Sequence, residues 1–241
     1  MKEEAPTDSS LEDLRNRLRE ASEPGRVEVL QRFFKTGPGA YGEGDVFLGV
    51  RVPEVRRIAR RFDALELEDV LTLLRSPVHE ERLASLVILV RRYGRGDEAA
   101  RGRVYETYLE NTDRIDNWDL VDASAPQIVG AHLLGRERAV LDRLARSPSL
   151  WERRISIMAT LTFIRAGDFG DTLRLARVLL HDQHDLIHKA TGWMLREVGK
   201  RDKATLLRFL EAHASRMPRT MLRYAVERLD PSTRARLMGK D

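Results

Sequence analysis

The sequence repeats one short pattern four times at a nearly constant period: RLASL (82–86), WDLVD (118–122), RISIM (154–158) and KATGW (189–193). The successive steps are 36, 36 and 35 residues. A helix pair repeated at a fixed period is typical of a solenoid, in which neighbouring pairs bury a common core. The period is shorter than the ~40–47 residues of HEAT and armadillo repeats. We therefore predict an all-α fold, an α-α superhelix of HEAT-like helical repeats.

Apolar residues recur at spacings of three and four almost to the C-terminus, which is the period of amphipathic helices. No stretch shows a convincing strand pattern. We expect residues 1–9 to form a disordered tail and residues 10–241 to form a single HEAT-like repeat domain. The predicted helices cover 10–21, 24–36, 53–62, 66–75, 78–93, 97–110, 117–133, 136–146, 149–165, 169–181, 184–199, 202–214, 217–228 and 231–238.

Prolines and glycines punctuate several of these helices. A side-chain acceptor followed by proline predicts an N-cap with proline at the first helical position. This pattern occurs at Ser76-Pro77, Ser147-Pro148 and Asp230-Pro231. Glycine just after a helix predicts its end, and the candidate stops are Gly94, Gly135, Gly167 and Gly199.

The composition limits the possible classes of protein. A hydrophobic content of 42% over 241 residues is enough to bury a substantial core. The chain has no Cys, which excludes disulfides and thiolate metal sites and permits a reducing compartment. No run approaches the roughly 18 apolar residues of a membrane span, and the polar start is unlike a signal peptide. We expect a cytoplasmic, nucleoid-associated bacterial protein that enters no membrane.

The formal net charge of +4 permits a nucleic-acid partner, although 42 basic residues are nearly matched by 38 acidic ones. The repeat adds to this indication of a nucleic-acid partner. When its four copies are aligned, the first position, or first column, holds Arg82, Trp118, Arg154 and Lys189. Stacked helices would align the three basic side chains on one exposed face, as a track for a polyanion. The alternative is ordinary solvated helix surface.

The column four residues later holds Leu86, Asp122, Met158 and Trp193. Three of its members are apolar, so Asp122 stands where the pattern predicts burial. A buried carboxylate needs a partner or a functional role. A structural role, in which Asp122 caps a neighbouring helix, is the alternative.

Trp118 and Asp122 are four residues apart, which places an indole face and a carboxylate side by side on a helix. Trp193 lies in the second column two repeats further along, and in a curved array the two indoles and the carboxylate would converge. Such a site suits a flat, cationic substrate, because indole faces attract cations. Core packing is the alternative role for each tryptophan.

Three other patterns carry no predicted chemistry. Residues 37–42 match G-x-G-x-x-G, but they follow a helix instead of a strand, so we reject a dinucleotide site and expect an exposed loop. His181, His184 and His188 lack the flanking carboxylate of a metal motif, so we predict no metal. Glu80 and Glu81 begin a predicted helix, where they complement its dipole.

These motifs resemble the AlkD-type family of HEAT-like DNA glycosylases over about residues 30–200. The resemblance is carried by NWDLVD (117–122), WERR (151–154), KATGWMLRE (189–197) and the stretch FFKTGPGAYGEGD…FLGVRVP within 33–53. It implies a right-handed superhelix whose concave basic face holds duplex DNA. The implied activity is the release of N3- and N7-alkylated purines, without a metal or cofactor.

The resemblance also implies roles for individual residues. Asp122 matches the catalytic carboxylate, and Trp118 and Trp193 match the aromatic residues that contact the deoxyribose of the lesion. The phosphate contacts are implied at Arg154, Arg196 and Arg57, and the repeat column adds Arg82 and Lys189. One departure is Phe33, which stands where family members can carry a tyrosine.

We therefore predict a monofunctional, monomeric glycosylase that hydrolyses the N-glycosidic bond of alkylated purines in duplex DNA, for base excision repair. No lysine belongs to the predicted catalytic residues, which argues against Schiff-base lyase chemistry. The alternative is a non-catalytic HEAT-like scaffold for damaged or branched DNA. A third possibility is a protein-interaction solenoid, because a fold does not fix a function.

Overall fold

The structure is a computed structural model that describes residues 10–239. Within these residues the regular structure is helical, and the β pairing is limited to one isolated parallel bridge between Val46 and Val78. This confirms the predicted all-α fold class. The tail predicted at residues 1–9 lies outside the described residues. None of the described helices is long and apolar enough to cross a membrane.

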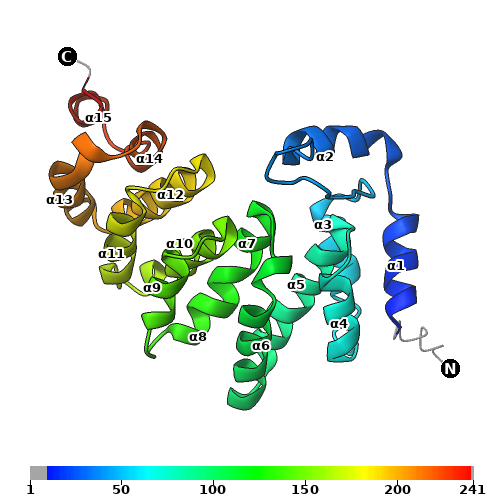
Figure 1. Cartoon of the computed structure of the whole chain (residues 1–241). Helices are drawn as coiled ribbons and strands as arrows, with labels where there is room; N and C mark the ends of the chain where they lie inside the picture. Colours follow the sequence, from blue (N-terminus) through cyan, green and yellow to red (C-terminus); the bar gives the residue numbers. More distant parts are fainter. Residues whose placement is uncertain (1–9, 240–241) are drawn as a thin grey trace. The chain divides into compact units, whose positions relative to one another are not determined.

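The chain divides into two compact units, one ending at Ser124 and the other beginning at Ala125. That both belong to one repeat domain remains a prediction. The first unit contains α1 (Leu11–Glu20), η1 (Pro24–Arg26), α2 (Val27–Phe34), α3 (Val52–Ala59), α4 (Leu67–Leu74), α5 (His79–Arg95), α6 (Glu98–Glu110), η2 (Thr112–Arg114) and most of α7 (Trp118–Ala125) (Figure 1).

The second unit begins with a π-helical segment and continues in helix pairs (Figure 1). Its elements are η3 (Pro126–Gly130), α8 (Ala131–Leu133), α9 (Ala139–Ala145), α10 (Leu150–Arg165), α11 (Gly170–Leu179), α12 (Asp185–Arg201), α13 (Lys203–His213), η4 (Ala214–Arg216), α14 (Arg219–Ala225) and α15 (Pro231–Leu237).

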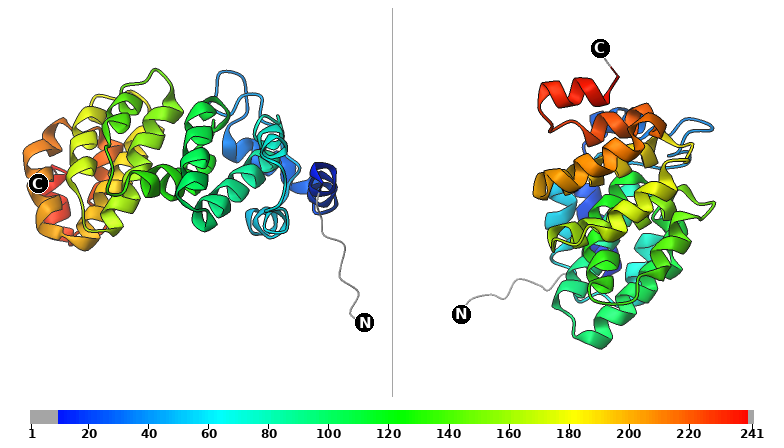
Figure 2. Two further views of the ribbon diagram at one scale, coloured as in Figure 1. Left: turned by 90° about the horizontal axis from the view of Figure 1, so that it is seen from below. Right: turned by 90° about the vertical axis from the view of Figure 1, so that its left-hand side faces the viewer.

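In the first unit, the long helix α5 packs against α3, α4 and α6 (Figure 2). Most of α5 is buried, including Leu83, Leu86, Ile88 and Leu89. Two backbone hydrogen bonds at the Val46 bridge tie the segment after α2 to the start of α5. These contacts bring the loop between α2 and α3 to the N-terminal end of α5.

In the second unit, α10 and α12 are the central helices. The former packs against η3, α9, α11 and α12, and the latter packs against α11, α13 and α14. The four aligned stretches of the repeat lie on α5, α7, α10 and α12. Each of these is the second helix of a pair, which agrees with the prediction of one helix pair per step.

The helix predicted over 117–133 is wrong as a continuous α-helix. The structure breaks it into α7, the π-helical η3 and α8. Pro126 begins η3 and has no N–H for the α-helical ladder, so the regular hydrogen-bond pattern cannot continue through it. The break follows Asp122 by four residues.

Two of the three proline-marked N-caps are also wrong. Helix α5 is preceded by Val78, and α10 is capped by Ser149. The reason is a local turn, because the hydroxyls of Ser76 and Ser147 each accept from the N–H two residues later. Asp230 is an N-cap as predicted, since its side chain accepts from the N–H of Thr233.

Of the four glycines predicted to end helices, two do so and two do not. Gly135 and Gly167 follow helix ends with φ of 80° and 82°, values that favour glycine. Gly94 and Gly199 instead lie within α5 and α12. At Gly199 an added Cβ would lie 2.3 Å from the side chain of Leu206, so this glycine serves helix packing.

Gly192 allows α14 to approach α12 closely. A Cβ at Gly192 would lie 2.4 Å from the carbonyl oxygen of Met221 and 2.6 Å from the Cβ of Tyr224. Because backbone atoms cannot rotate away, α14 would have to move. The fold of the second unit therefore depends on a glycine at this position.

We predict that Gly192→Ala lowers the free energy of unfolding by about 1–3 kcal/mol, the usual cost of overpacking. Gly102→Ala is the matched control, because no atom lies within 4 Å of its added Cβ. Urea denaturation of both variants measures the difference. Equal stability of the two variants would contradict the close packing of α12 and α14.

Candidate functional site

Helix α7 begins with Trp118 and carries Asp122 one turn further along. The side chain of Asn117 supports this start, because its Oδ1 accepts a hydrogen bond from the Trp118 N–H at 2.8 Å. Trp118 and Asp122 are both half-buried, and residues four apart lie on the same face of a helix. An indole and a carboxylate therefore stand side by side on α7.

A stack of aromatic rings supports the indole from the interior. The ring of Trp118 stacks on Phe34 at 5.5 Å, Phe34 stacks on Phe47 at 5.1 Å, and Phe47 stacks on His79 at 4.8 Å. Phe33 lies edge-on to Trp118 at 5.7 Å and is 59% exposed. Trp118 and Phe33 thus form an aromatic surface that is open to solvent in this unit.

The imidazole of His79 is held between two carboxylates. Its Nδ1 lies 3.0 Å from Asp45 Oδ2, and its Nε2 lies 2.9 Å from Asp119 Oδ2. The Asn117 amide also donates to Asp45 Oδ2 at 3.0 Å. These contacts, together with those of Arg82 and Asp116, form the His79 network. It joins the loop before α3, the start of α5 and the start of α7.

Arg82 belongs to this network and does not form part of an exposed basic track. Its guanidinium pairs with Asp45, donates to the carbonyl of Ser76 at 3.0 Å and lies 3.3 Å from Asp116 Oδ1. The residue is only 3% exposed. The expectation that Arg82 lies on an exposed face is therefore wrong, because Asp45 and Asp116 hold its guanidinium in the network, and a phosphate contact by Arg82 remains a prediction.

The network shifts the pKa values of its members. Burial by itself would lower the pKa of His79, but the hydrogen bonds to Asp119 and Asp45 outweigh it and raise the pKa to about 9. Burial tends to raise the pKa of Asp45, whereas His79 and Arg82 bring it below its ordinary value. Burial raises the pKa of Asp116, although Arg82 opposes this. His79 is therefore an imidazolium at neutral pH.

The glycine-rich loop (residues 37–45) folds back on the end of α2. The N–H of Gly42 donates to the carbonyl of Lys35 at 3.3 Å, and a Cβ on Gly42 would lie 2.4 Å from the carbonyl oxygen of Phe34. The N–H of Gly39 donates to the carboxylate of Glu43 at 2.8 Å. The loop ends at Asp45, where the His79 network holds it.

Glu80 and Glu81 have tertiary partners that the helix-dipole interpretation did not include. Glu81 pairs with Arg15 of α1 at 3.1 Å. The buried carboxylate of Glu80 accepts backbone hydrogen bonds, at 2.9 to 3.1 Å, from the N–H groups of Leu48, Gly49 and Val50. This carboxylate fixes the segment that leads into α3.

The surroundings of Asp122 include the hydroxyl of Tyr108. Tyr108 is buried in α6, and its Oη lies 2.9 Å from the Ser124 hydroxyl. Burial raises the pKa of this phenol, and the negative charge of Asp122 raises it further. Tyr108 therefore remains neutral, and its hydroxyl positions Ser124, two residues after the predicted catalytic carboxylate.

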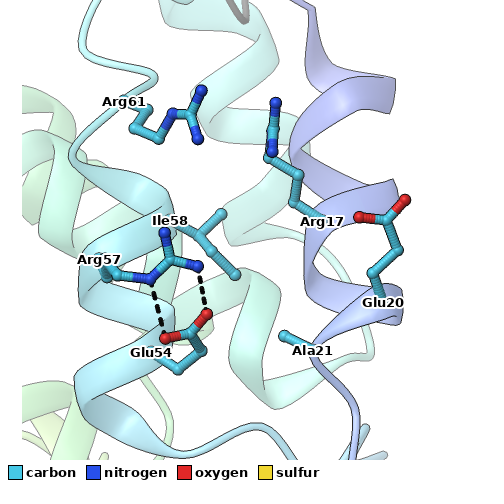
Figure 3. A pocket seen from close by; sticks show the side chains of 7 residues that line it. All are labelled: Arg17, Glu20, Ala21, Glu54, Arg57, Ile58 and Arg61. Carbon is cyan, nitrogen blue, oxygen red and sulfur yellow. Dashed lines mark hydrogen bonds and ion pairs between the residues drawn. The ribbon is translucent and has the colours of Figure 1, made fainter.

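Arg57 lies on α3 beside a small cavity of about 190 Å³ (Figure 3). The arginines Arg17 and Arg61 also line this cavity. The guanidinium of Arg57 is 62% exposed and forms two hydrogen bonds with the carboxylate of Glu54, one of them at 2.9 Å. Three guanidinium groups, from α1, α3 and the turn after α3, thus border one cavity, with Glu54 paired to one of them.

In the second unit, α12 carries three of the predicted site residues. Lys189, Trp193 and Arg196 are spaced by four and three residues, so they share one face of the helix. Lys189 pairs with Asp185 at 2.8 Å. The indole N–H of Trp193 donates to Glu197 Oε1 at 3.0 Å, which orients the ring.

Arg196 forms an ion pair with Glu227, a residue near the C-terminal end of α14. Its Nε is buried and has no hydrogen-bond partner. Glu227 itself is about half exposed. The hydrogen-bonding capacity of the Arg196 guanidinium is therefore only partly satisfied within the protein, by a carboxylate that is accessible to solvent.

Arg154 on α10 differs from the predicted exposed residue. It is 4% exposed, and its Nη1 donates to the carbonyl of Leu186 at 2.6 Å. The contact joins α10 to the first turn of α12, so the expectation that Arg154 lies on an exposed surface is wrong. A phosphate contact by Arg154 remains a prediction.

Two of the three clustered histidines, His184 and His188, have structural partners. His184 Nδ1 accepts from the N–H of Leu186 at 3.1 Å and so caps α12. His188 Nε2 lies 2.6 Å from the carbonyl of Asp182. Among residues 10–239, no group of three or more His, Asp or Glu side chains is arranged to hold a metal ion.

The sequence motifs gave no role to Asp45, His79, Asn117 and Asp119, and they did not indicate the tertiary partners of Glu80. One signal was present, because His79 and Arg82 are three residues apart at a helix start and so share a face. A second signal was Asp45, a carboxylate directly after the glycine-rich loop. Neither signal identifies the partner, since 34 residues separate Asp45 from His79.

Comparisons with known proteins agree with this architecture. A family model described as "DNA alkylation repair enzyme" matches residues 14–229. The chain is also similar to a solved structure described as "Predicted DNA alkylation repair enzyme from Enterococcus faecalis", with a TM-score of 0.69 and 14% sequence identity. The match covers 87% of this chain and 97% of that one, and at this identity it shows the fold alone. No curated protein matches the chain.

We predict that the His79 network makes stability depend on pH. The folded protein keeps the proton of His79 to a pH of about 9, whereas the unfolded chain loses it near 6.5. This stabilisation is complete below pH about 6.5 and is lost as the pH rises through about 9, by roughly 3 kcal/mol in total. Urea denaturation of wild type and His79→Gln at several pH values measures it.

The exposed His181→Gln serves as the control and should follow the wild-type curve. Parallel dependence on pH in wild type and His79→Gln would contradict a protonated His79 in the folded protein.

Proposed function

This chain belongs to the DNA alkylation repair enzyme family, and we propose that it is a monofunctional DNA glycosylase that excises N3- and N7-alkylated purines from duplex DNA. It would act as a monomer and hydrolyse the N-glycosidic bond. The observation that carries this proposal is the pair on α7, where the half-buried carboxylate of Asp122 follows the supported indole of Trp118 by one turn. This pair provides a fixed negative charge beside an aromatic surface.

The chemistry needs little more than these groups. A purine alkylated at N3 or N7 carries a positive charge and is a good leaving group, so it departs with the electron pair of the glycosidic bond. The deoxyribose then becomes oxocarbenium-like, and water adds to its anomeric carbon and loses a proton. A preorganised carboxylate at Asp122 would stabilise the positive sugar, with a typical effect of 10²–10³ in rate.

Trp118 would contact the sugar through its indole face, because cation–π attraction contributes roughly 0.5–2 kcal/mol. The stack on Phe34 and the edge of Phe33 hold this face in place. Phe33 has no hydroxyl, so it would contact the nucleotide only through its exposed apolar ring. In the second unit, Trp193 is proposed to contact the deoxyribose as well.

Three of the proposed phosphate contacts share one feature. Arg57, Lys189 and Arg196 each form an ion pair with a carboxylate on a solvent-accessible side chain. A DNA phosphate would replace that carboxylate and release the counterions of the DNA, so affinity would fall steeply with salt. Arg154 is proposed as a further contact, with its guanidinium anchored to the backbone of α12.

We predict that Asp122→Asn reduces the release of 7-methylguanine from methylated duplex DNA by about 10²–10³, because it removes the negative charge. Asp113→Asn is the control, since Asp113 is an exposed carboxylate on η2 that pairs with Arg114. Single-turnover assays with enzyme in excess measure the rate. Equal rates for wild type and Asp122→Asn would end the catalytic assignment, and DNA binding without release by wild type would favour a non-catalytic scaffold.

We further predict opposite effects for the two members of the Arg196 pair. Arg196→Ala should weaken DNA binding and reduce the salt slope by about one. Glu227→Gln should strengthen binding, because it frees the guanidinium for a phosphate. Fluorescence anisotropy titrations at several salt concentrations measure both.

Glu211→Gln is the matched control for the second variant, because it removes one exposed negative charge from the same unit. If Glu227→Gln and Glu211→Gln have equal effects, and Arg196→Ala leaves the salt slope unchanged, Arg196 makes no phosphate contact.

A further inference from the structure

The His79 network connects two segments that the proposed site needs. Asp45 ends the glycine-rich loop, and Asp119 lies in the first turn of α7, directly after Trp118. The ring of His79 contacts both carboxylates, at 3.0 and 2.9 Å. On the other side the same ring stacks on Phe47, within the stack that supports Trp118. A change at His79 therefore reaches α7 by two independent routes.

The proton on His79 is required for this connection. A protonated imidazole donates from both nitrogens, whereas a neutral one donates from only one of them. Without the second proton, a ring lone pair would face a carboxylate that is itself largely buried, since Asp45 is 8% and Asp119 is 15% exposed. Buried carboxylates that lose a partner are strongly destabilised, so Asp45 or Asp119 would move.

The charged groups that face His79 come from several surrounding elements, and most of them are carboxylates. Asp45 approaches from the loop, Asp119 from α7 and Asp116 from the segment before it, while Arg82 of α5 is the other cation. The elements that contribute Phe34 and Phe47 present rings to His79. Three carboxylates thus surround two cations, and loss of the His79 proton would leave Arg82 alone among them.

We propose that His79 is a positioning residue, whose protonated ring holds Asp45 and Asp119 together and thereby fixes Trp118 and Asp122 for base release. The inference rests on the proposed glycosylase function, although the geometry that it describes does not. His79 lies at the buried end of the aromatic stack and is 2% exposed, so we expect it to make no contact with the substrate. Activity should therefore fall as the pH rises through about 9, the pKa of His79.

The kinetic test compares wild type, His79→Gln and the control His181→Gln in single-turnover release of 7-methylguanine from duplex DNA. Misplacement of a reacting group by about 1 Å can cost roughly 10²-fold, so His79→Gln should be about 10- to 100-fold slower near pH 7. Its DNA affinity should be unchanged, because no phosphate contact is lost. The ratio of wild-type to His79→Gln rates removes the effect of pH on the substrate, and this ratio should decline towards one above pH about 9.

A second readout does not depend on activity. NMR of the full chain with ¹⁵N-labelled histidine and tryptophan follows the His79 ring nitrogens and the Trp118 indole N–H, which is assigned with Trp118→Phe. In wild type both signals should shift together as the pH rises through about 9. In His79→Gln the Trp118 signal should show no step at that pH.

The outcomes separate the two proposals. A neutral His79 at pH about 7 would overturn the positioning role whatever the activity. A Trp118 indole signal that does not shift when His79 titrates would overturn it as well. A ratio of rates that does not change with pH would overturn it as well. A wild type that releases no base at any pH, with coupled NMR titrations, would contradict the proposed function and leave the coupling supported. If His79→Gln does not fold, the wild-type titrations alone decide.

Discussion

The contact of the His79 ring with the carboxylates of Asp45 and Asp119 is the interaction on which the site of the first unit depends. It places a buried imidazolium at the meeting point of the glycine-rich loop, α5 and α7. Arg82 adds a second cation to the same carboxylate cluster. Because both cations are paired with carboxylates, the cluster is tolerated in the interior. The cluster also fixes the position at which α7 begins, and this sets the orientation of the Trp118 side chain.

Above this buried layer, α7 presents groups that suit reaction at a positive sugar. The aromatic stack supports Trp118 from one side, and Asp122 follows on the same helix face. The second unit contributes a different kind of surface, in which Lys189 and Arg196 of α12 are balanced by exposed carboxylates. The near equality of basic and acidic residues in the sequence is reflected in these pairs, because most of the basic residues proposed to contact DNA already form an ion pair with a carboxylate of the protein.

Much of the fold could be predicted from the sequence, because helix positions follow from local periodicity and the repeat follows from self-similarity. The pairing of Trp118 with Asp122 was accessible for the same reason. The His79 network was not, because 34 and 40 residues separate His79 from its two carboxylates. Arg82 illustrates the difficulty, since a helical arginine reads as exposed until its distant partner Asp45 is known. Ser76 and Ser147 are not N-caps, because each hydroxyl closes a turn with the N–H two residues later, before the helix begins.

We propose that α7 is the element that contacts the damaged nucleotide. A crystal structure of the protein bound to duplex DNA with a tetrahydrofuran abasic-site analogue tests it most directly. We expect the carboxylate of Asp122 to lie within about 4–6 Å of the C1′ position of the analogue, the range over which opposite charges stabilise each other. We also expect the indole of Trp118 to contact the sugar ring. A duplex bound away from α7, or one whose analogue faces away from Asp122, would contradict the claim.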